Sequence, residues 1–126
     1  MHRTALTLTV AVALSACNSH RYYAEAMQYH ALATSVLMSR GVCASSQDCQ
    51  RRQILFAEGG EFSLGVATWG GAYITLYSIS DEALVQDLAL AFRKLHGRLK
   101  QPKVVLTVYS SAHGQAKVRF REVEIT

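Results

Sequence analysis

The sequence predicts a two-layer α+β domain, with about four mostly antiparallel strands and two helices in the order αββαββ. Two segments, 20–40 and 80–99, carry apolar residues at helical spacing, and a pair of β-prone segments follows each of them. The chain has 126 residues, of which 50% are apolar and only one is proline. It is therefore long enough for one core, and its composition excludes disorder as a description of the whole.

The first helix is expected over residues 20–40, because Gly41 is placed like a residue that ends a helix. Its apolar stripe consists of Tyr22, Ala26, Tyr29, Ala33, Val36 and Leu37. A polar loop with two cysteines follows, and residues 51–57 are a short strand candidate. Residues 59–71 hold five of the eight glycines, and the β-prone segment 72–79 comes next. This order predicts a hairpin with a wide, flexible tip.

The second helix begins near Ser80, which is a suitable N-cap, with Asp81 and Glu82 in the first turn, where the helix dipole favours negative charge. Pro102 prevents its continuation. Its apolar stripe consists of Leu84, Leu88, Ala91, Phe92, Leu95 and Leu99. We expect this helix to connect neighbouring strands by a right-handed crossover, and both helices to cover one face of the sheet.

The last two strands are expected over residues 104–109 and 118–125, with a turn over 110–114 between them. In the last strand the apolar residues change phase between Phe120 and Val123. This change indicates a β-bulge near Arg121 and Glu122, or a change of face. The strand order stays open.

The N-terminal residues have the anatomy of a signal peptide: a positive start, about ten mostly apolar residues, and then Ser15 and Ala16 before Cys17. The segment Leu14-Ser15-Ala16-Cys17 resembles the lipobox of bacterial lipoproteins. The resemblance implies that the Cys17 sulfur receives a diacylglycerol, that cleavage occurs just before Cys17, and that its freed amine is acylated. An ordinary secretory signal with a chance cysteine is the alternative.

This resemblance divides the chain into a signal peptide, 1–16, and one lipid-anchored domain, 17–126. Several acyl chains give stable attachment, at about 0.8 kcal/mol per buried methylene. The expected location is the cell envelope, facing the periplasm, with the membrane contacted through lipidated Cys17. Asn18 stands where the family's sorting rule places Asp for inner-membrane retention, which favours the outer membrane.

Cys43 and Cys49 lie in the polar loop, and an envelope location permits their oxidation. We therefore predict a disulfide between them. A redox pair would favour Cys-x-x-Cys, and a zinc site needs four ligands at a recognisable spacing. Neither pattern occurs in the sequence.

We expect no catalytic residue, no metal site and no cofactor. The glycine-rich segment lacks the Gly-Lys-Ser/Thr end of a phosphate-binding loop, and the five histidines form no metal pair at helical spacing. Ser110, His113 and Asp81 are the residue types of a hydrolase triad. No Gly-x-Ser-x-Gly motif supports this combination. The formal charge of +4 is scattered and mild, so no nucleic-acid partner is expected.

The remaining functional indication comes from aromatic and basic residues that could bind a partner. Trp69, placed in a loop, Phe62 and Tyr73 are the predicted partner-binding residues, because aromatic side chains dominate protein interfaces. The basic side chains near the end of the second helix either meet anionic headgroups or an acidic partner, or form a solvated helix end. They are Arg93, Lys94, Arg98, Lys100 and Lys103.

The sequence thus predicts a non-enzymatic envelope protein that binds another protein. It would be an immunity or inhibitor protein directed at a toxin, or an accessory part of a secretion or conjugation machine. The alternative is a cell-envelope hydrolase or a small-ligand carrier. A binder should show a shallow apolar patch around Trp69 or on an uncovered sheet face, whereas an enzyme should show a concave site with perturbed titratable groups.

Overall fold

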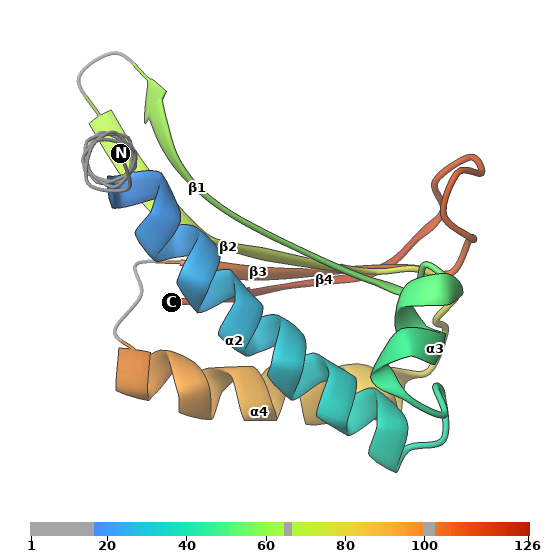
Figure 1. Ribbon diagram of the computed structural model, residues 1–126. Helices are drawn as coiled ribbons and strands as arrows, with labels where there is room; N and C mark the ends of the chain where they lie inside the picture. Colours follow the sequence, from blue (N-terminus) through green and yellow to red (C-terminus); the bar gives the residue numbers. More distant parts are fainter. Residues whose placement is uncertain (1–16, 65–66, 100–102) are drawn as a thin grey trace, which may run out of the picture.

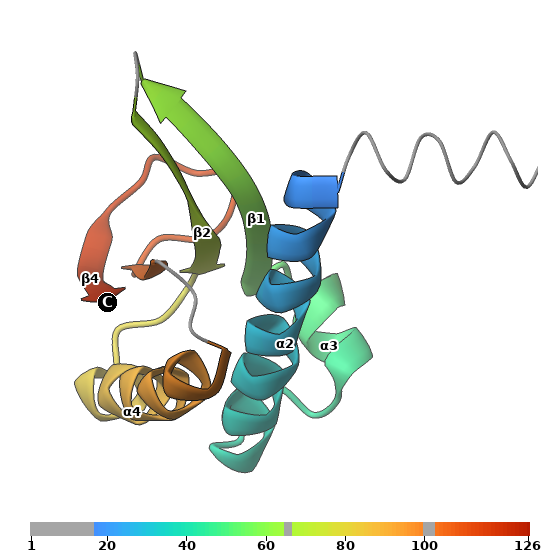
Figure 2. The ribbon, with the colours of Figure 1, turned by 90° about the vertical axis from the view of Figure 1, so that its left-hand side faces the viewer.

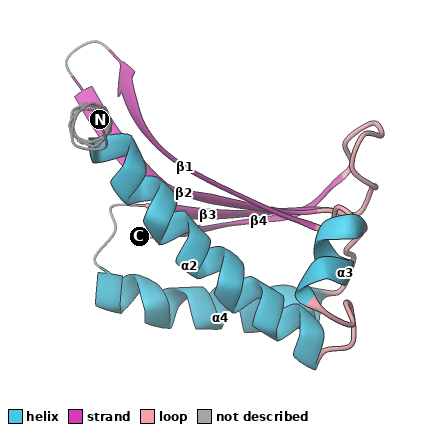
Figure 3. Cartoon of the chain, in the orientation of Figure 1, coloured by secondary structure: helices cyan, strands magenta, loops and turns pink. Residues whose placement is uncertain are grey.

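The computed structural model describes residues 17–64, 67–99 and 103–126, with side chains from 22–59, 70–99 and 103–126. The predicted signal peptide, 1–16, lies outside the described residues. The described helices are α2 (Cys17–Ser39), α3 (Ser46–Arg51) and α4 (Glu82–Leu99). The strands are β1 (Leu55–Leu64), β2 (Ala67–Leu76), β3 (Val104–Tyr109) and β4 (Arg119–Ile125). The predicted α+β fold with a four-stranded sheet is confirmed (Figure 3).

The strands follow one another across the sheet in the order β1-β2-β3-β4. β1 and β2 are antiparallel, as are β3 and β4, whereas β2 and β3 are parallel and are connected through α4. The prediction of a wide hairpin tip is wrong, because the β1–β2 ladder extends as far as the pair Leu64 and Ala67. Within this ladder Gly60 pairs with Gly71, so the glycine-rich segment forms strands.

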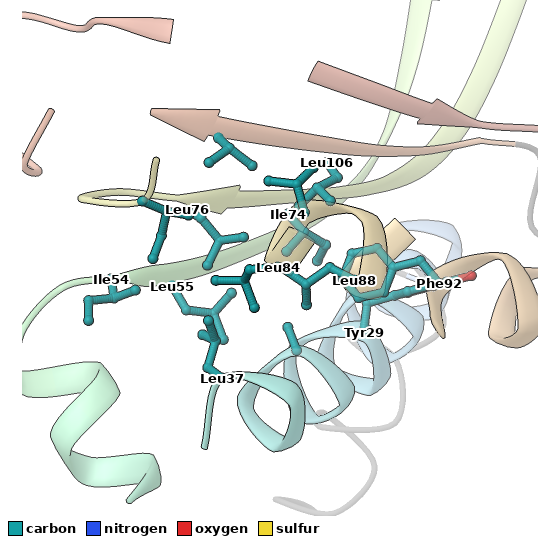
Figure 4. Close-up of a cluster of buried hydrophobic side chains, with 14 of the residues drawn as sticks. Tyr29, Leu37, Ile54, Leu55, Ile74, Leu76, Leu84, Leu88, Phe92 and Leu106 are labelled. Atoms are coloured by element: carbon teal, nitrogen blue, oxygen red, sulfur yellow. The ribbon is translucent and has the colours of Figure 1, made fainter. Parts of the chain in front are cut away.

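The helices α2 and α4 lie on the same face of the sheet, as Figures 1 and 2 show. The core fills the space between the two layers (Figure 4). In β3 every second residue is buried, because successive side chains of a strand point to opposite faces. Between the helices, the rings of Tyr29 and Phe92 meet edge to face, with centroids 5.2 Å apart.

Two glycines let the beginning of α2 approach the sheet closely. A Cβ at Gly59 would overlap the backbone carbonyl of Tyr22, and a Cβ at Gly70 would overlap the Tyr22 ring. Because glycine has only a hydrogen atom as its side chain, these two positions leave the room that the helix needs. Gly59 and Gly70 thus serve the packing of α2 on the hairpin.

A short helix, α3, occupies part of the segment that the sequence predicts as a polar loop. The Ser45 hydroxyl accepts a hydrogen bond from the Asp48 backbone N–H at 3.1 Å and so caps this helix. The Asp48 carboxylate accepts from the Ala44 backbone N–H and from Arg51, and these bonds lower the pKa of Asp48. The residue 51–57 strand candidate correspondingly begins only at Leu55.

The predicted disulfide between Cys43 and Cys49 is confirmed, with the two Cα atoms 5.2 Å apart. Both cysteines are buried, and they join the loop after α2 to the middle of α3.

The N-cap of α4 differs from the prediction: it is Asp81, whose carboxylate accepts from the Leu84 backbone N–H at 3.2 Å, and not Ser80. The predicted bulge near Arg121 is confirmed. It lies at Phe120, since Val108 pairs with Arg121 while Tyr109 pairs with Arg119.

Candidate functional site

The face of the sheet opposite the helices is open: no described helix covers it (Figure 2). The β1–β2 hairpin and the segment that connects β3 to β4 both rise on this side, as seen in Figure 1. Residues of β2 that alternate with the buried Ile74 and Leu76 belong to this face, among them Tyr73 and Thr75.

A hollow of about 320 Å³ lies on the open face. Residues from β1, β2, β3 and the β3–β4 connection contribute to it, so it is formed by segments that are distant in the sequence. Its lining residues are Phe56, Ala57, Glu58, Tyr73, Thr75, Tyr77, Tyr109, His113 and Lys117.

Four rings form a continuous cluster in this hollow. The Phe56 ring stacks on the His113 imidazole at 4.7 Å between centroids, and the Tyr77 ring stacks on the Tyr109 ring at 5.2 Å. Tyr77 also meets His113 edge to face at 5.0 Å, which links the two stacks. Such ring pairs contribute about 0.5–1.5 kcal/mol each beyond the area that they bury. These contacts hold the four rings in one arrangement without any bound molecule.

The cluster has a buried base and an exposed rim. Tyr77 is 8% exposed, whereas Phe56 is 37% exposed. The Lys117 ammonium lies 5.4 Å from the Tyr109 ring centroid, within the range of a cation–π contact. Together with Glu58 it adds charges of both signs to an apolar centre. A preordered aromatic centre with a charged border is the composition of a protein-binding hot spot.

The Ser–His–Asp combination does not assemble. Asp81 caps α4, the His113 ring stacks on Phe56, and the Ser110 hydroxyl donates to the Val118 carbonyl at 3.3 Å. Each of the three residues has a separate structural contact. The arrangement therefore contains no nucleophile with an adjacent oriented base.

Two groups with displaced pKa values lie on α2, on the other side of the sheet. Burial and the neighbouring Glu25 charge raise the pKa of Tyr29 to about 12. Burial lowers the pKa of His30 below its usual value. Packing explains both shifts, and neither residue borders the hollow.

Among the described residues no group of three or more His, Cys, Asp or Glu side chains is close enough to hold a metal ion. The same part of the chain contains no helix that is both long and apolar enough to cross a membrane.

The structure separates the three predicted partner-binding residues. Tyr73 borders the hollow, whereas Phe62 and Trp69 pair with each other farther along the hairpin. Trp69 belongs to β2 and not to a loop, because the strand begins at Ala67. The side chains of Phe62 and Trp69 lie outside the described residues. Cys17, the predicted lipid-attachment residue, is the first residue of α2, and its side chain is also outside them.

Phe56 and His113, which stack on each other in this hollow, were not among the binding residues predicted from the sequence. Strand alternation could have placed Tyr109 on the open face, because this residue is out of phase with the buried Val104, Leu106 and Val108. No local pattern marks His113, because its ring partners come from residues 36 and 57 positions earlier in the chain.

Comparison with known proteins found no matching family model, no similar curated protein and no similar solved structure.

Proposed function

We propose that this chain is a small lipid-anchored cell-envelope protein that acts by binding another protein through the hollow on the open face. The stacked cluster of Phe56, Tyr77, Tyr109 and His113 is the observation that carries the proposal. Monomeric proteins seldom keep several ordered aromatic rings on an uncovered sheet face without a binding role.

The two biological forms of this function are an immunity or inhibitor protein that neutralises a toxin, and an accessory component of an envelope secretion or conjugation machine. The envelope location comes from the lipobox resemblance at Cys17, and Asn18 favours the outer membrane, with the domain facing the periplasm. Both forms require a surface that binds without chemistry.

A quantitative pull-down from an envelope fraction tests the binding surface. Protein beginning at Asn18 is compared with the variants Phe56→Ala and Tyr109→Ala and with the control Met38→Ala, which alters an exposed apolar residue on α2. Loss of a hot-spot ring costs about 2 kcal/mol or more, which is roughly a 30-fold loss of affinity. A Trp69→Ala variant tests the outer part of the hairpin separately.

Retention of the same partner by wild type and both ring variants would contradict the proposed surface. If the pure protein retains no partner and instead turns over a peptidoglycan or ester substrate, the binding function itself is wrong and the hydrolase alternative stands.

Mass spectrometry of the membrane-bound protein tests the anchor. Wild type should carry acyl chains on Cys17, whereas Cys17→Ser should lose them and be processed differently. Identical processing of the two proteins would refute the lipoprotein assignment.

A further inference from the structure

The outer surface of the two helices, opposite the open sheet face, carries an apolar groove bordered by cations. Two adjoining hollows of about 350 and 420 Å³ run between α2 and α4 and share Leu32 and Arg98. The apolar lining includes Leu90, which is 54% exposed, and Leu95. Lys94 also borders the groove. We call this region the helical surface.

The charge of the helical surface is positive. Lys94 and Arg98 are exposed, and neither forms an ion pair with another described residue. Asp87 also borders the groove, but its carboxylate accepts hydrogen bonds from Arg40. Favourable interaction with the α4 dipole accounts for cations at this helix end. It does not account for the exposed Leu90, which lines the same groove as Lys94 and Arg98.

The position predicted to carry the anchor shares a helical phase with a residue of the groove. Position 17 precedes Gln28 by 11 residues, which is about three turns of an α-helix, so the two positions share one helical phase. Gln28 lines the groove together with Ala31. The helix is uninterrupted from Cys17 to Ser39, and close packing of Tyr22 on Gly59 holds its first turns to the sheet.

From this geometry we propose that the helical surface rests on anionic phospholipid headgroups, with Leu90 at the lipid interface and Lys94 and Arg98 at the phosphates. The proposal rests on the lipid anchor at Cys17. Exposed apolar residues beside Lys and Arg are the composition of helical surfaces that bind at membrane interfaces. In this orientation the open face of the sheet, which lies away from the two helices (Figure 2), points away from the membrane, where a partner can reach its aromatic rings.

Vesicle co-sedimentation tests the proposal with unlipidated protein beginning at Asn18, which retains every buried core residue. The vesicles contain either equal parts of phosphatidylglycerol and phosphatidylcholine or phosphatidylcholine alone. Each Lys or Arg at an anionic surface contributes roughly fivefold to binding, so Lys94→Gln/Arg98→Gln should weaken binding to the mixed vesicles about 30-fold. The charge-matched control, Arg51→Gln/Arg119→Gln, should keep nearly wild-type binding, because these exposed residues lie on α3 and β4.

An equal loss in both double variants would show a general effect of net charge and overturn the proposal, as would failure of the wild type to bind the mixed vesicles. A Leu90→Glu variant provides a second measure if a double variant does not fold, and it should also lose binding. Unchanged binding of Leu90→Glu would refute the proposal. The assay needs neither acylation nor a protein partner, so its failure is distinct from failure of the anchor or of the binding function.

Discussion

At positions 59 and 70 the sheet carries glycine because α2 lies too close for any side chain. At Gly59 the obstacle is the Tyr22 backbone carbonyl, which cannot move without shifting the helix. At Gly70 it is the end of the Tyr22 side chain, which can rotate at a lower cost. A third glycine, Gly97 in α4, has open space around it.

Alanine substitutions should therefore have opposite effects on stability. We expect Gly59→Ala to lower the free energy of unfolding by about 1–3 kcal/mol through overpacking, and Gly70→Ala to lower it less. Gly97→Ala, in contrast, should raise it by about 0.5–1 kcal/mol, since alanine is the better helix former. Urea denaturation measures all three variants. Equal stability of Gly59→Ala and wild type would mean that α2 is not seated on the sheet as described.

Among the elements, α4 has the clearest beginning in the sequence, yet its cap lies one residue later than expected. Ser80 and Asp81 are both good N-cap residues, and only the backbone geometry decides between them. The Asp81 carboxylate accepts from the Leu84 N–H, and the first helical residue is Glu82.

The cap assignment predicts different costs for two neighbouring residues. Asp81→Ala should lower the free energy of unfolding by about 1 kcal/mol because the Leu84 N–H loses its acceptor. Ser80→Ala, at an exposed position before the cap, should change it by less than about 0.5 kcal/mol. Thermal denaturation compares the two variants. A larger loss for Ser80→Ala would restore the cap that the sequence alone suggested.

The disulfide also connects two elements, because it joins the loop after α2 to α3. Closure of this short ring should stabilise the protein by roughly 2.4 kcal/mol in the chain-entropy model. Cys43→Ala/Cys49→Ala should lower the unfolding free energy by about that amount, as measured by urea denaturation under non-reducing conditions. If the double variant is as stable as wild type, the bond contributes nothing to the folded state.

For the whole molecule, the two layers leave two different outer surfaces. The sheet presents ordered aromatic rings, and the helices present an apolar groove with cations. In α4, Leu88 faces the core and is 0% exposed, whereas Leu90, two residues later, is 54% exposed. Two residues of the same type on one helix therefore have different environments.

This contrast predicts which leucine stabilises the fold. Leu88→Ala should cost about 3 kcal/mol, because it leaves a cavity between the layers. Leu90→Ala should change the unfolding free energy by less than about 0.5 kcal/mol. Urea denaturation of the two variants separates a role in folding from a role in binding. A large loss for Leu90→Ala would show that the helical surface is needed for folding and weaken its assignment to the membrane.

Some features of the fold could be predicted from the sequence, and others could not. The helix α4 and the strand 104–109 were predictable because their signals are local: a cap, a stop and a period of buried residues. The cysteine pair was predictable from spacing and compartment. The short helix α3 was not, since its six residues carry no apolar period and are held by the Ser45 cap and the disulfide.

Local patterns in the sequence were enough to predict the class of the fold, the kind and order of the main elements and the disulfide, and the resemblance to a lipobox is the ground on which the anchor is proposed. Three features became visible only in the folded chain: the parallel pairing of β2 with β3, the packing of α2 against Gly59 and Gly70, and the assembly of Phe56, Tyr77, Tyr109 and His113 in one hollow. The physical reason is the range of the interactions. Periodicity and capping act within a few residues, whereas strand neighbours and ring stacks join residues that are close only after the chain has folded.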